Sequence, residues 1–213
     1  MDDDAPAPRA RRSRRAATAE RRAEIVRAAA RTFGTKGYRT GSLADVAEQV
    51  GITHAGVLHH FGTKEQLLVE VLQLRDEQGV ADLEGQHIPG GIELFHHLVR
   101  TAQANAERRG IVQGYTVLTG ESVTEDHPAR AWVSERFTTL RGEIAAAVIA
   151  VGGPSVRDED ARRAASAVIG LMDGLQVQWL LDPDAVDLAA TTRVGIEAIL
   201  SATCPSATIP HLG

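Results

Sequence analysis

The chain has 213 residues, of which 43% are apolar, 24% charged and only 4% aromatic, and its formal net charge is −5. This composition predicts a globular, all-α protein, because a core poor in aromatic residues favours packed helices over sheets. A single cysteine, Cys204, excludes a disulfide framework and a cysteine-based zinc site, and the lack of a ~20-residue apolar run or signal-peptide core predicts a cytoplasmic protein without a membrane span.

Residues 1–17 combine prolines, alanines and three aspartates with the arginine run RARRSRR, and we expect a disordered basic arm. Residues 1–70 carry 12 Lys and Arg against 9 Asp and Glu, whereas residues 71–213 carry 11 against 19. A basic N-terminal third on an acidic body indicates a surface that binds a polyanion. Taken alone, the arginines are equally consistent with a solvated tail.

Three helices are predicted between residues 18 and 63. The first begins after Thr18 and carries apolar residues four apart until Gly34 and Gly37 end it. Ser42 then opens a second helix, because its spacing to Asp45 is that of a capping box.

After a glycine at position 51, Thr53 caps a short third helix over about residues 54–60. The order helix, glycine turn, helix is that of a helix-turn-helix motif. On the short helix, Val57 faces the core, whereas Gly56 and His59 point away from it. A glycine within a helix costs about 1 kcal/mol relative to alanine. Close approach to a partner would offset that cost, and the DNA major groove admits one helix.

Residues 64–201 predict a helical body, which brings the total to about nine helices, and residues 202–213, with two prolines, predict a flexible tail. The last two helices, about 158–181 and 187–201, are apolar on more than one face. A symmetric second copy would bury the excess in a four-helix interface, which predicts a homodimer. The alternative is that earlier helices of the body cover these faces.

The segments GYRTGSLADVAEQV and GITHAGVLHHFGTKEQLL carry a specific resemblance over residues 22–72. They resemble the tetracycline-repressor (TetR-like) family of bacterial regulators. The resemblance implies a three-helix DNA-binding head, a helical ligand-binding and dimerisation body, and a homodimer on a palindromic operator in double-stranded DNA. It also implies repression that an unidentified small-molecule effector relieves, and no cofactor.

The candidate DNA contacts come from the arm, the two caps, the short helix and the residue that starts the fourth helix. The resemblance implies that Lys64 contacts phosphate, and free amides at a helix start favour the same ligand. Leu58 stands where many relatives have a phosphate-contacting tyrosine, so we expect the neighbours to carry that contact. His60 either faces DNA or packs under the head. The candidates are Ser42, Thr53, His54, Ala55, Gly56, His59, His60, Lys64, Arg14 and Arg15, and Arg11 and Arg12 belong to the same arm.

Six large or polar residues in otherwise apolar helices are candidate effector contacts, with a tyrosine and a glutamine as polar anchors. Their helical spacing is equally that of ordinary core residues. They are Tyr115, Trp132, Phe137, Met172, Gln176 and Trp179.

Metal and enzyme sites find little support in the sequence. Adjacent residues on a helix, such as His59 and His60, point about 100° apart, whereas metal pairs prefer i, i+3 or i, i+4 spacing. One Glu-x-x-His motif, starting at Glu93, is half of what a di-iron bundle needs. The acidic residues from Glu121 onward and His127 precede a proline, where we expect them to cap and solvate a helix end. The alternatives are a helical small-molecule-binding protein or enzyme with a vestigial head, and an architectural DNA-binding protein without a ligand.

Overall fold

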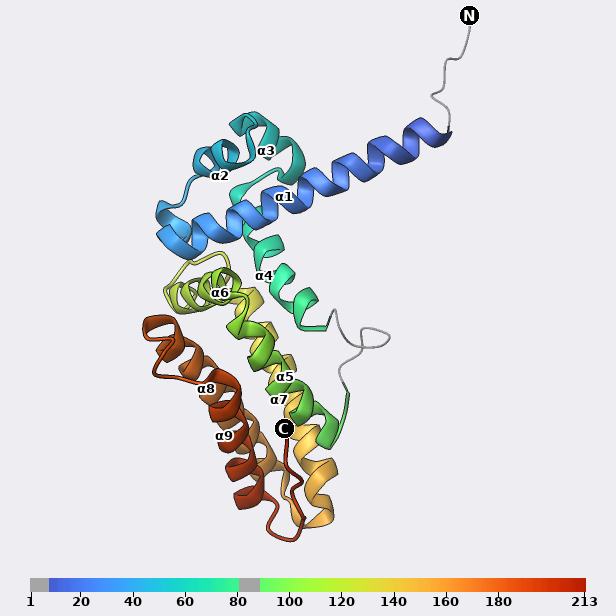
Figure 1. The fold of residues 1–213 in the computed structure, drawn as a ribbon, viewed down its shortest axis with the longest axis vertical. Helices are drawn as coiled ribbons and strands as arrows, with labels where there is room; N and C mark the ends of the chain where they lie inside the picture. The colour runs from blue at the N-terminus through green and yellow to red at the C-terminus, as the bar shows by residue number, and fades with distance from the viewer. Residues whose placement is uncertain (1–7, 81–88) are drawn as a thin grey trace, which may run out of the picture.

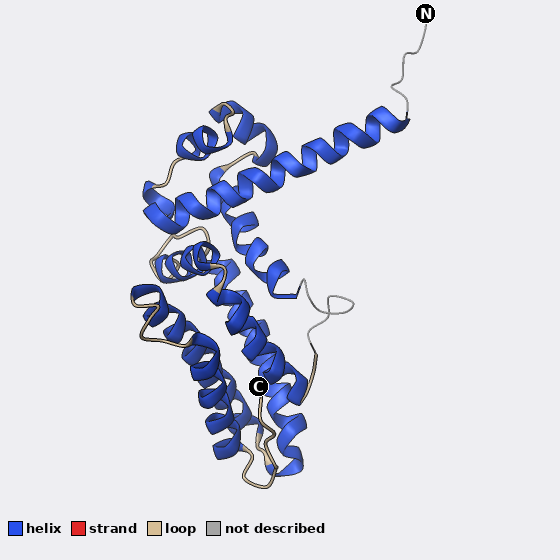
Figure 2. Cartoon of the chain, viewed as in Figure 1, coloured by secondary structure: helices blue, strands red, loops and turns tan. Residues whose placement is uncertain are grey.

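The computed structural model describes the backbone of residues 8–80 and 89–213 and the side chains of residues 16–74 and 89–213. Within these ranges the protein contains no strand (Figure 2). The helices of the described chain, in order (Figure 1), are α1 (Pro8–Thr40), α2 (Leu43–Val50), α3 (His54–Phe61), α4 (Lys64–Val80), α5 (Ile92–Ala106), α6 (Arg109–Glu121), α7 (Arg130–Gly152), the 3₁₀ turn η2 (Gly153–Ser155), α8 (Asp158–Leu181) and α9 (Leu188–Thr203). The prediction of an all-α protein with about nine helices is confirmed.

The first helix begins earlier than the sequence indicated. It starts at Pro8, so residues 8–17, expected to be disordered, are helical and extend away from the rest of the molecule (Figure 1). Alanine and arginine have high helix propensity, and proline fits the first turn of a helix, which explains the longer element. Residues 1–7 and the side chains of the arginine run lie outside the described residues.

The first helix is broken at Gly37, as predicted. Gly37 has φ 74° and ψ 168°, a conformation that glycine adopts without steric cost, and a short helical segment follows it to Thr40. Gly34 was expected to end the helix as well, and that expectation is wrong. Gly34 stays helical, and its missing side chain allows a close contact with another helix.

Close approach between α1 and α6 depends on two glycines. A side-chain carbon on Gly34 would lie 2.8 Å from the Cα atom of Gly114 and 3.0 Å from its backbone nitrogen. A carbon on Gly114 would lie 3.2 Å from the carbonyl oxygen of Ala30. The amide of Gln113 also donates a hydrogen bond of 3.0 Å to the Gly34 carbonyl. The two backbones therefore touch without side chains between them.

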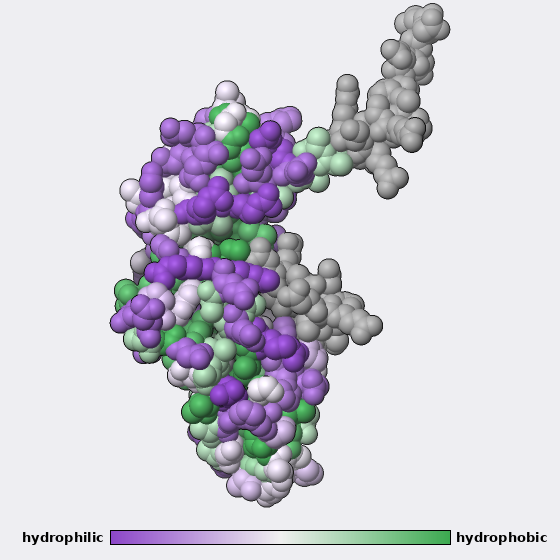
Figure 3. Space-filling model, in the orientation of Figure 1, coloured by the Kyte–Doolittle hydropathy of each residue, from purple (hydrophilic) through white to green (hydrophobic). Residues whose placement is uncertain are grey.

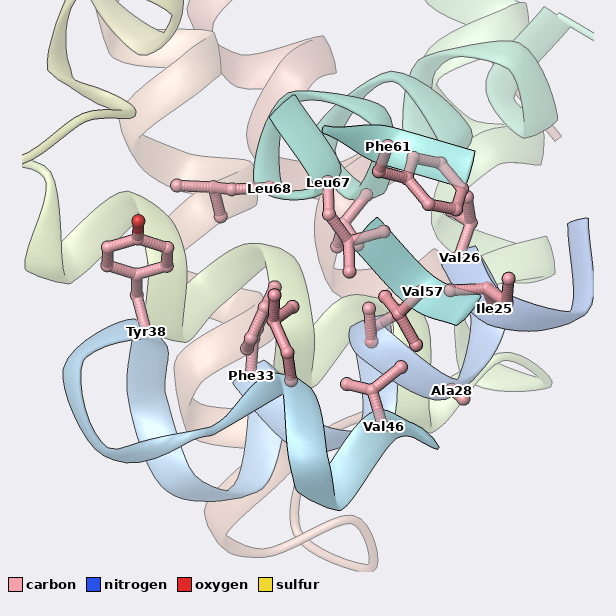
Figure 4. Packing of buried hydrophobic residues seen from close by; sticks show 14 of the residues in the cluster. Ile25, Val26, Ala28, Phe33, Tyr38, Val46, Val57, Phe61, Leu67 and Leu68 are labelled. Atoms are coloured by element: carbon pink, nitrogen blue, oxygen red, sulfur yellow. The ribbon is translucent and has the colours of Figure 1, made fainter. Parts of the chain in front are cut away.

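The core of the head continues into the body. Phe33 from α1, Val46 from α2 and Val57 from α3 converge with Leu67 from α4 (Figure 4). The same cluster of buried residues includes Leu118 of α6 and residues that precede or belong to α7. A boundary at residues 63 and 64 thus separates elements of the chain, but the buried core crosses it.

A second cluster of buried residues joins α5, α7, α8 and α9 below the head. The C-terminal residues belong to it, in contrast to the flexible tail expected over 202–213. Cys204 and Leu212 are 1% and 2% exposed, and the backbone N–H of Leu212 donates a 2.9 Å hydrogen bond to Glu197. The tail is ordered against the body because its apolar side chains pack into the body core. The two prolines, on which the prediction of a flexible tail was based, carry no information about that packing.

Helix α8 has the length and composition that a membrane-crossing helix needs, and it is the one such helix among the described residues. One third of its apolar window is buried, and its first turn carries three acidic residues. It packs between α7 and α9. A core helix of a folded domain has the same length and composition. Part of the apolar surface of α8, including Val177 and Leu181, is exposed in the single chain.

The start of α2 is fixed by charge as well as by hydrogen bonds. The Ser42 hydroxyl accepts the N–H of Asp45 at 3.1 Å, and the Asp45 carboxylate accepts the N–H of Ser42 at 3.0 Å, which confirms the predicted capping box. The ammonium of Lys36 lies 2.9 Å from the same carboxylate. Its hydrogen bond, followed by those of Ser42, lowers the pKa of Asp45 from 3.8 to about 2.

We expect the substitution Gly34→Ala to lower the free energy of unfolding by about 1–3 kcal/mol, because the new methyl group must displace the backbone of α6. Urea unfolding followed by circular dichroism measures this change. Gly120→Ala is the matched control, because a side-chain carbon there meets nothing within 4 Å. Equal losses of stability in the two variants would contradict the assignment.

The capping box predicts a stability difference that depends on pH. The pKa of Asp45 is lower in the folded protein, so its contribution is present above the unfolded pKa and is lost as the pH falls through about 2. Unfolding free energies of the native protein and Asp45→Asn should therefore differ near pH 6 and converge towards about pH 2. The exposed Glu48 of the same helix supplies the control Glu48→Gln. A gap between native protein and Asp45→Asn that persists at low pH would refute this account.

Candidate DNA-binding surface

The turn between α2 and α3 presents α3 at the edge of the head. Gly51 adopts the left-handed conformation with φ 71° and ψ 34°, and the N–H of Ile52 returns to the carbonyl of Ala47 at 3.0 Å. Thr53 then caps α3, because its hydroxyl accepts the N–H of Gly56 at 3.1 Å. The predicted helix-turn-helix geometry is therefore present, with both caps formed.

The two faces of α3 differ as the sequence predicted. Val57 is fully buried, whereas His54, Ala55 and His59 are exposed. A side-chain carbon on Gly56 would make ordinary contacts of 3.4–3.6 Å with Thr53 and the neighbouring isoleucine. Packing within the head therefore tolerates alanine at position 56, and contacts within the head do not require the glycine.

His60 turns to another side of the head. It is half-buried and lines an open groove of about 460 Å³ together with Arg22, Phe61 and residues of α4. The Arg22 guanidinium lies 4.6 Å from the centre of the Phe61 ring and forms two 2.6 Å hydrogen bonds to Glu70. Of the two alternatives for His60, this position favours packing beside α1 and α4.

Lys64 begins α4 next to α3. The pair Thr63 and Gln66 caps this helix reciprocally, with N–H to side-chain distances of 3.2 and 3.1 Å. The Lys64 ammonium lies 4.4 Å from the centre of the Tyr38 ring and 3.5 Å from the carbonyl of Arg39. Partial burial lowers its pKa. A half-buried cation at a helix start, with a long single hydrogen bond, retains protons that an anion can accept.

Sequence reasoning missed the residues that hold Lys64 in place. The Tyr38 hydroxyl donates a 2.9 Å hydrogen bond to Glu65, and its backbone N–H donates a 2.7 Å hydrogen bond to Glu121 of α6. Burial, followed by the hydrogen bond to Glu65, raises the pKa of Tyr38 well above its usual range, so the phenol stays a donor. Tyr38 and Glu121 are 83 residues apart, and no local pattern signals such a contact.

Glu121, Glu125, Asp126 and His127 were expected to cap and solvate a helix end. Glu125 and Asp126 are exposed as expected and Glu121 is half-exposed at the end of α6, whereas for His127 the expectation is wrong. His127 is 4% exposed and packs edge-on against Tyr38, with ring centres 5.3 Å apart. Asp126, with φ 59°, turns the chain back after α6 and so carries His127 under the head. Burial is the main reason that the pKa of His127 is lowered.

The structure does not bring the six candidate effector residues together. Trp132 and Phe137 pack against the head core, Met172 packs against the body core, and Trp179 belongs to a third cluster. Tyr115 is buried, and its hydroxyl accepts a 3.0 Å hydrogen bond from Arg136. Gln176 is also buried, and its carbonyl oxygen has no hydrogen-bond partner in the described part of the chain.

Tyr115 lines a cavity of about 10 Å³ between α1, α4 and α6, whose other lining residues are apolar or glycine. No three histidine, cysteine or acidic side chains among the described residues gather as a metal site would require.

Two family models match the chain. Residues 25–71 match the bacterial regulatory proteins of the tetR family, and residues 93–203 match the BetI-type transcriptional repressor C-terminal domain. The regulator TtgR of Pseudomonas putida is 30% identical over 181 residues, which cover 79% of this chain and 84% of TtgR. AcrR of Shigella flexneri is 26% identical over 200 residues, covering 88% and 92%.

Solved structures show the same fold. A TetR-family transcriptional regulator from Rhodococcus sp. superposes with a TM-score of 0.68 at 21% identity, covering 87% of this chain and 99% of that one. SmeT, the repressor of the Stenotrophomonas maltophilia multidrug efflux pump SmeDEF, has a TM-score of 0.67 at 17% identity and covers 89% and 95%. The helix-turn-helix head, the helical body and these relationships together identify the chain as a member of the TetR family, a ligand-responsive DNA-binding transcriptional regulator of the repressor type and not an enzyme.

Proposed function

We propose that this protein represses transcription as a homodimer whose two α3 helices read the half-sites of a palindromic operator. The observation that carries the proposal is the exposed face of α3, formed by His54, Ala55 and His59, beside the Lys64 ammonium. The major groove admits one helix, and a cation at the start of the next helix meets the phosphates at its edge. Such a protein acts on chromosomal DNA, which places it in the cytoplasm.

Each candidate DNA contact has a role in this arrangement. His54, Ala55, Gly56 and His59 face base edges, whereas Ser42, Thr53 and Lys64 meet phosphates. Thr53 keeps its capping bond in that role, because a hydroxyl that accepts from a backbone N–H still has a proton to donate. The Ser42 hydroxyl already donates a 2.9 Å hydrogen bond to Asp45 and would exchange that bond for one to phosphate. His60 lies beside this surface, on the side of the head where α1 and α4 form a groove. The remaining candidates, Arg14 and Arg15, belong to the N-terminal arm, and their side chains lie outside the described residues.

The homodimer forms through α8 and α9. An uncharged stripe runs along the exposed side of these helices, and it comprises Ala167, Gly170, Gly174, Val177 and Leu181 of α8 with Thr191, Val194 and Ala198 of α9. Val177, Leu181 and Val194 are 43%, 82% and 61% exposed. Side-chain carbons on Gly170 and Gly174 would meet nothing within 4 Å, so both glycines leave open space for a partner helix. A second copy would bury this face in a four-helix interface, which also accounts for the apolar character of α8.

The effector enters beside Tyr115. The cavity there holds about one water molecule, so a larger ligand must separate α4 from α6. Its apolar lining and single phenol favour a mainly apolar, uncharged effector. Since Lys64 and the cavity-lining Leu72 share α4, entry of the ligand would shift the phosphate contact. Gln176, whose buried oxygen has no partner in the described structure, is retained as a second polar candidate.

The operator is found by selecting duplexes from a random library with the purified protein, and binding is then measured at rising salt. We expect Lys64→Gln to weaken operator binding about tenfold and to reduce the slope of log affinity against log salt by about 1. Arg162→Gln, the same loss of charge at the far end of the body, is the control. Native protein that binds selected and random duplexes alike would refute the proposed function, and an unchanged salt slope would refute the role of Lys64.

The dimer predicts that Val177→Asp combined with Val194→Asp converts the protein to monomers, because two buried charges would face their symmetric copies. Sedimentation at micromolar concentration measures this change. Val123→Asp places the same charge at a residue that is 74% exposed in the loop after α6, and it should leave the dimer intact. A double variant that sediments like the native protein would exclude this interface.

A further inference from the structure

The C-terminal end of α6 reaches into the head through one carboxylate. Glu121 accepts the backbone N–H of Tyr38 at 2.7 Å through Oε2. Its other oxygen occupies the space beside Gly37, where any side-chain carbon would overlap it. Gly37 therefore serves two needs at once, because its positive φ and its missing side chain both allow the turn to close around Glu121. The contact joins a residue of the body to the turn that ends the first helix of the head.

The turn passes this constraint to the DNA-facing side of the head. Tyr38 presents its hydroxyl to Glu65 and its ring to the Lys64 ammonium. Lys64 and Glu65 lie in the first turn of α4, directly after α3. Tyr38 thus connects Glu121 of the body to Lys64, the candidate phosphate contact, through a 2.7 Å hydrogen bond on one side and a 4.4 Å cation–π contact on the other.

His127 supports the same turn from the body side. Its Nδ1 atom accepts the N–H of Ala129 at 3.2 Å, so the neutral ring carries its proton on Nε2. That atom has no hydrogen-bond partner among the described residues and lies 3.8 Å from Glu121 Oε2. The ring packs edge-on against Tyr38, and its Nε2 atom lies near the carboxylate without being hydrogen-bonded to it. Glu121 is held between the head turn and a body histidine.

We propose that Glu121 is a positioning residue that sets the angle of the DNA-binding head on the body, and that His127 is its support. Through this angle Glu121 determines the spacing of half-sites that the dimer accepts. The proposal rests on the proposed function, since spacing has meaning for a dimer on a palindrome. Without Glu121 the α1–α6 contact remains, but the head turns more freely about it.

The physical basis is the difference between a packed contact and a directed one. The glycine contact between α1 and α6 fixes how close the helices lie, whereas the apolar contacts of the shared core lack a defined direction and restrain rotation of the head less than a directed bond does. A hydrogen bond to a carboxylate is shorter and stronger than a neutral one and has a defined direction. Placed at the end of α6, away from the glycine pair, it restrains that rotation. Half-sites one helical turn apart require the two heads to hold matching angles.

The test measures spacing selectivity in the full-length dimer. The selected operator is compared with versions that carry one or two base pairs inserted or removed at its centre, and with a duplex that holds a single half-site. Each added base pair rotates one half-site by about a tenth of a turn relative to the other. The native protein should bind the altered spacings at least about tenfold more weakly.

Four variants separate length from charge. Glu121→Ala and Glu121→Asp, which cannot reach the Tyr38 N–H, should reduce the spacing penalty to about threefold or less while leaving single half-site affinity unchanged. Glu121→Gln keeps the length and an acceptor oxygen but forms the weaker, neutral hydrogen bond, so its spacing penalty should lie between those of Glu121→Ala and the native protein. Glu125→Ala removes an exposed carboxylate four residues further along and should behave as the native protein.

A native spacing penalty in both Glu121→Ala and Glu121→Asp would overturn the inference. So would an equal loss of affinity for the single half-site, because Glu121 would then act within the head alone. If Glu121→Ala does not fold, Glu121→Asp carries the test, since it retains the charge and most of the side chain. Failure of the native protein to prefer the selected operator would refute the proposed function instead, and that outcome is read before any variant is compared.

Discussion

The contact between α1 and α6 is the constraint on which the rest of the structure depends. Gly34 and Gly114 let two backbones touch, so the DNA-binding head and the body share one continuous buried core. A larger residue at either position would separate them. Because interiors are densely packed and deform little, a displacement of α6 cannot be absorbed locally and must move the head. This close contact therefore couples the position of α6 in the body to the position of the head.

The small cavity beside Tyr115 lies at the same junction, lined by α1, α4 and α6. Helix α4, which lines this cavity, also begins with Lys64. At the same junction, the backbone N–H of Tyr38 donates to Glu121 of α6, and the Tyr38 ring contacts the Lys64 ammonium. The Tyr38 hydroxyl donates to Glu65, the next residue of α4. The head is thus positioned by its own core and by one directed carboxylate from α6.

Glycine serves opposite purposes in different parts of the molecule. Inside, Gly34 and Gly114 remove side chains so that two helices of one chain meet. On the surface of the body, Gly170 and Gly174 of α8 face open space beside exposed valines and a leucine. The head differs, because polar residues cover much of its surface (Figure 3). A folded monomer leaves the apolar face of α8 exposed to water, whereas the proposed second copy would bury it. Contacts within the head would likewise tolerate a larger residue at Gly56.

The sequence by itself determined the features that depend on neighbouring residues. Capping boxes, the turn at Gly51, the break at Gly37 and the limits of α8 follow from hydrogen bonds and periodicity within a few residues, and all were predicted. The tertiary structure alone decided the rest. Gly34 proved to be a helix contact, Leu212 a core residue, and Glu121 and His127 parts of the head–body junction. These roles arise between residues far apart in the chain, where no local spacing records which surfaces will meet.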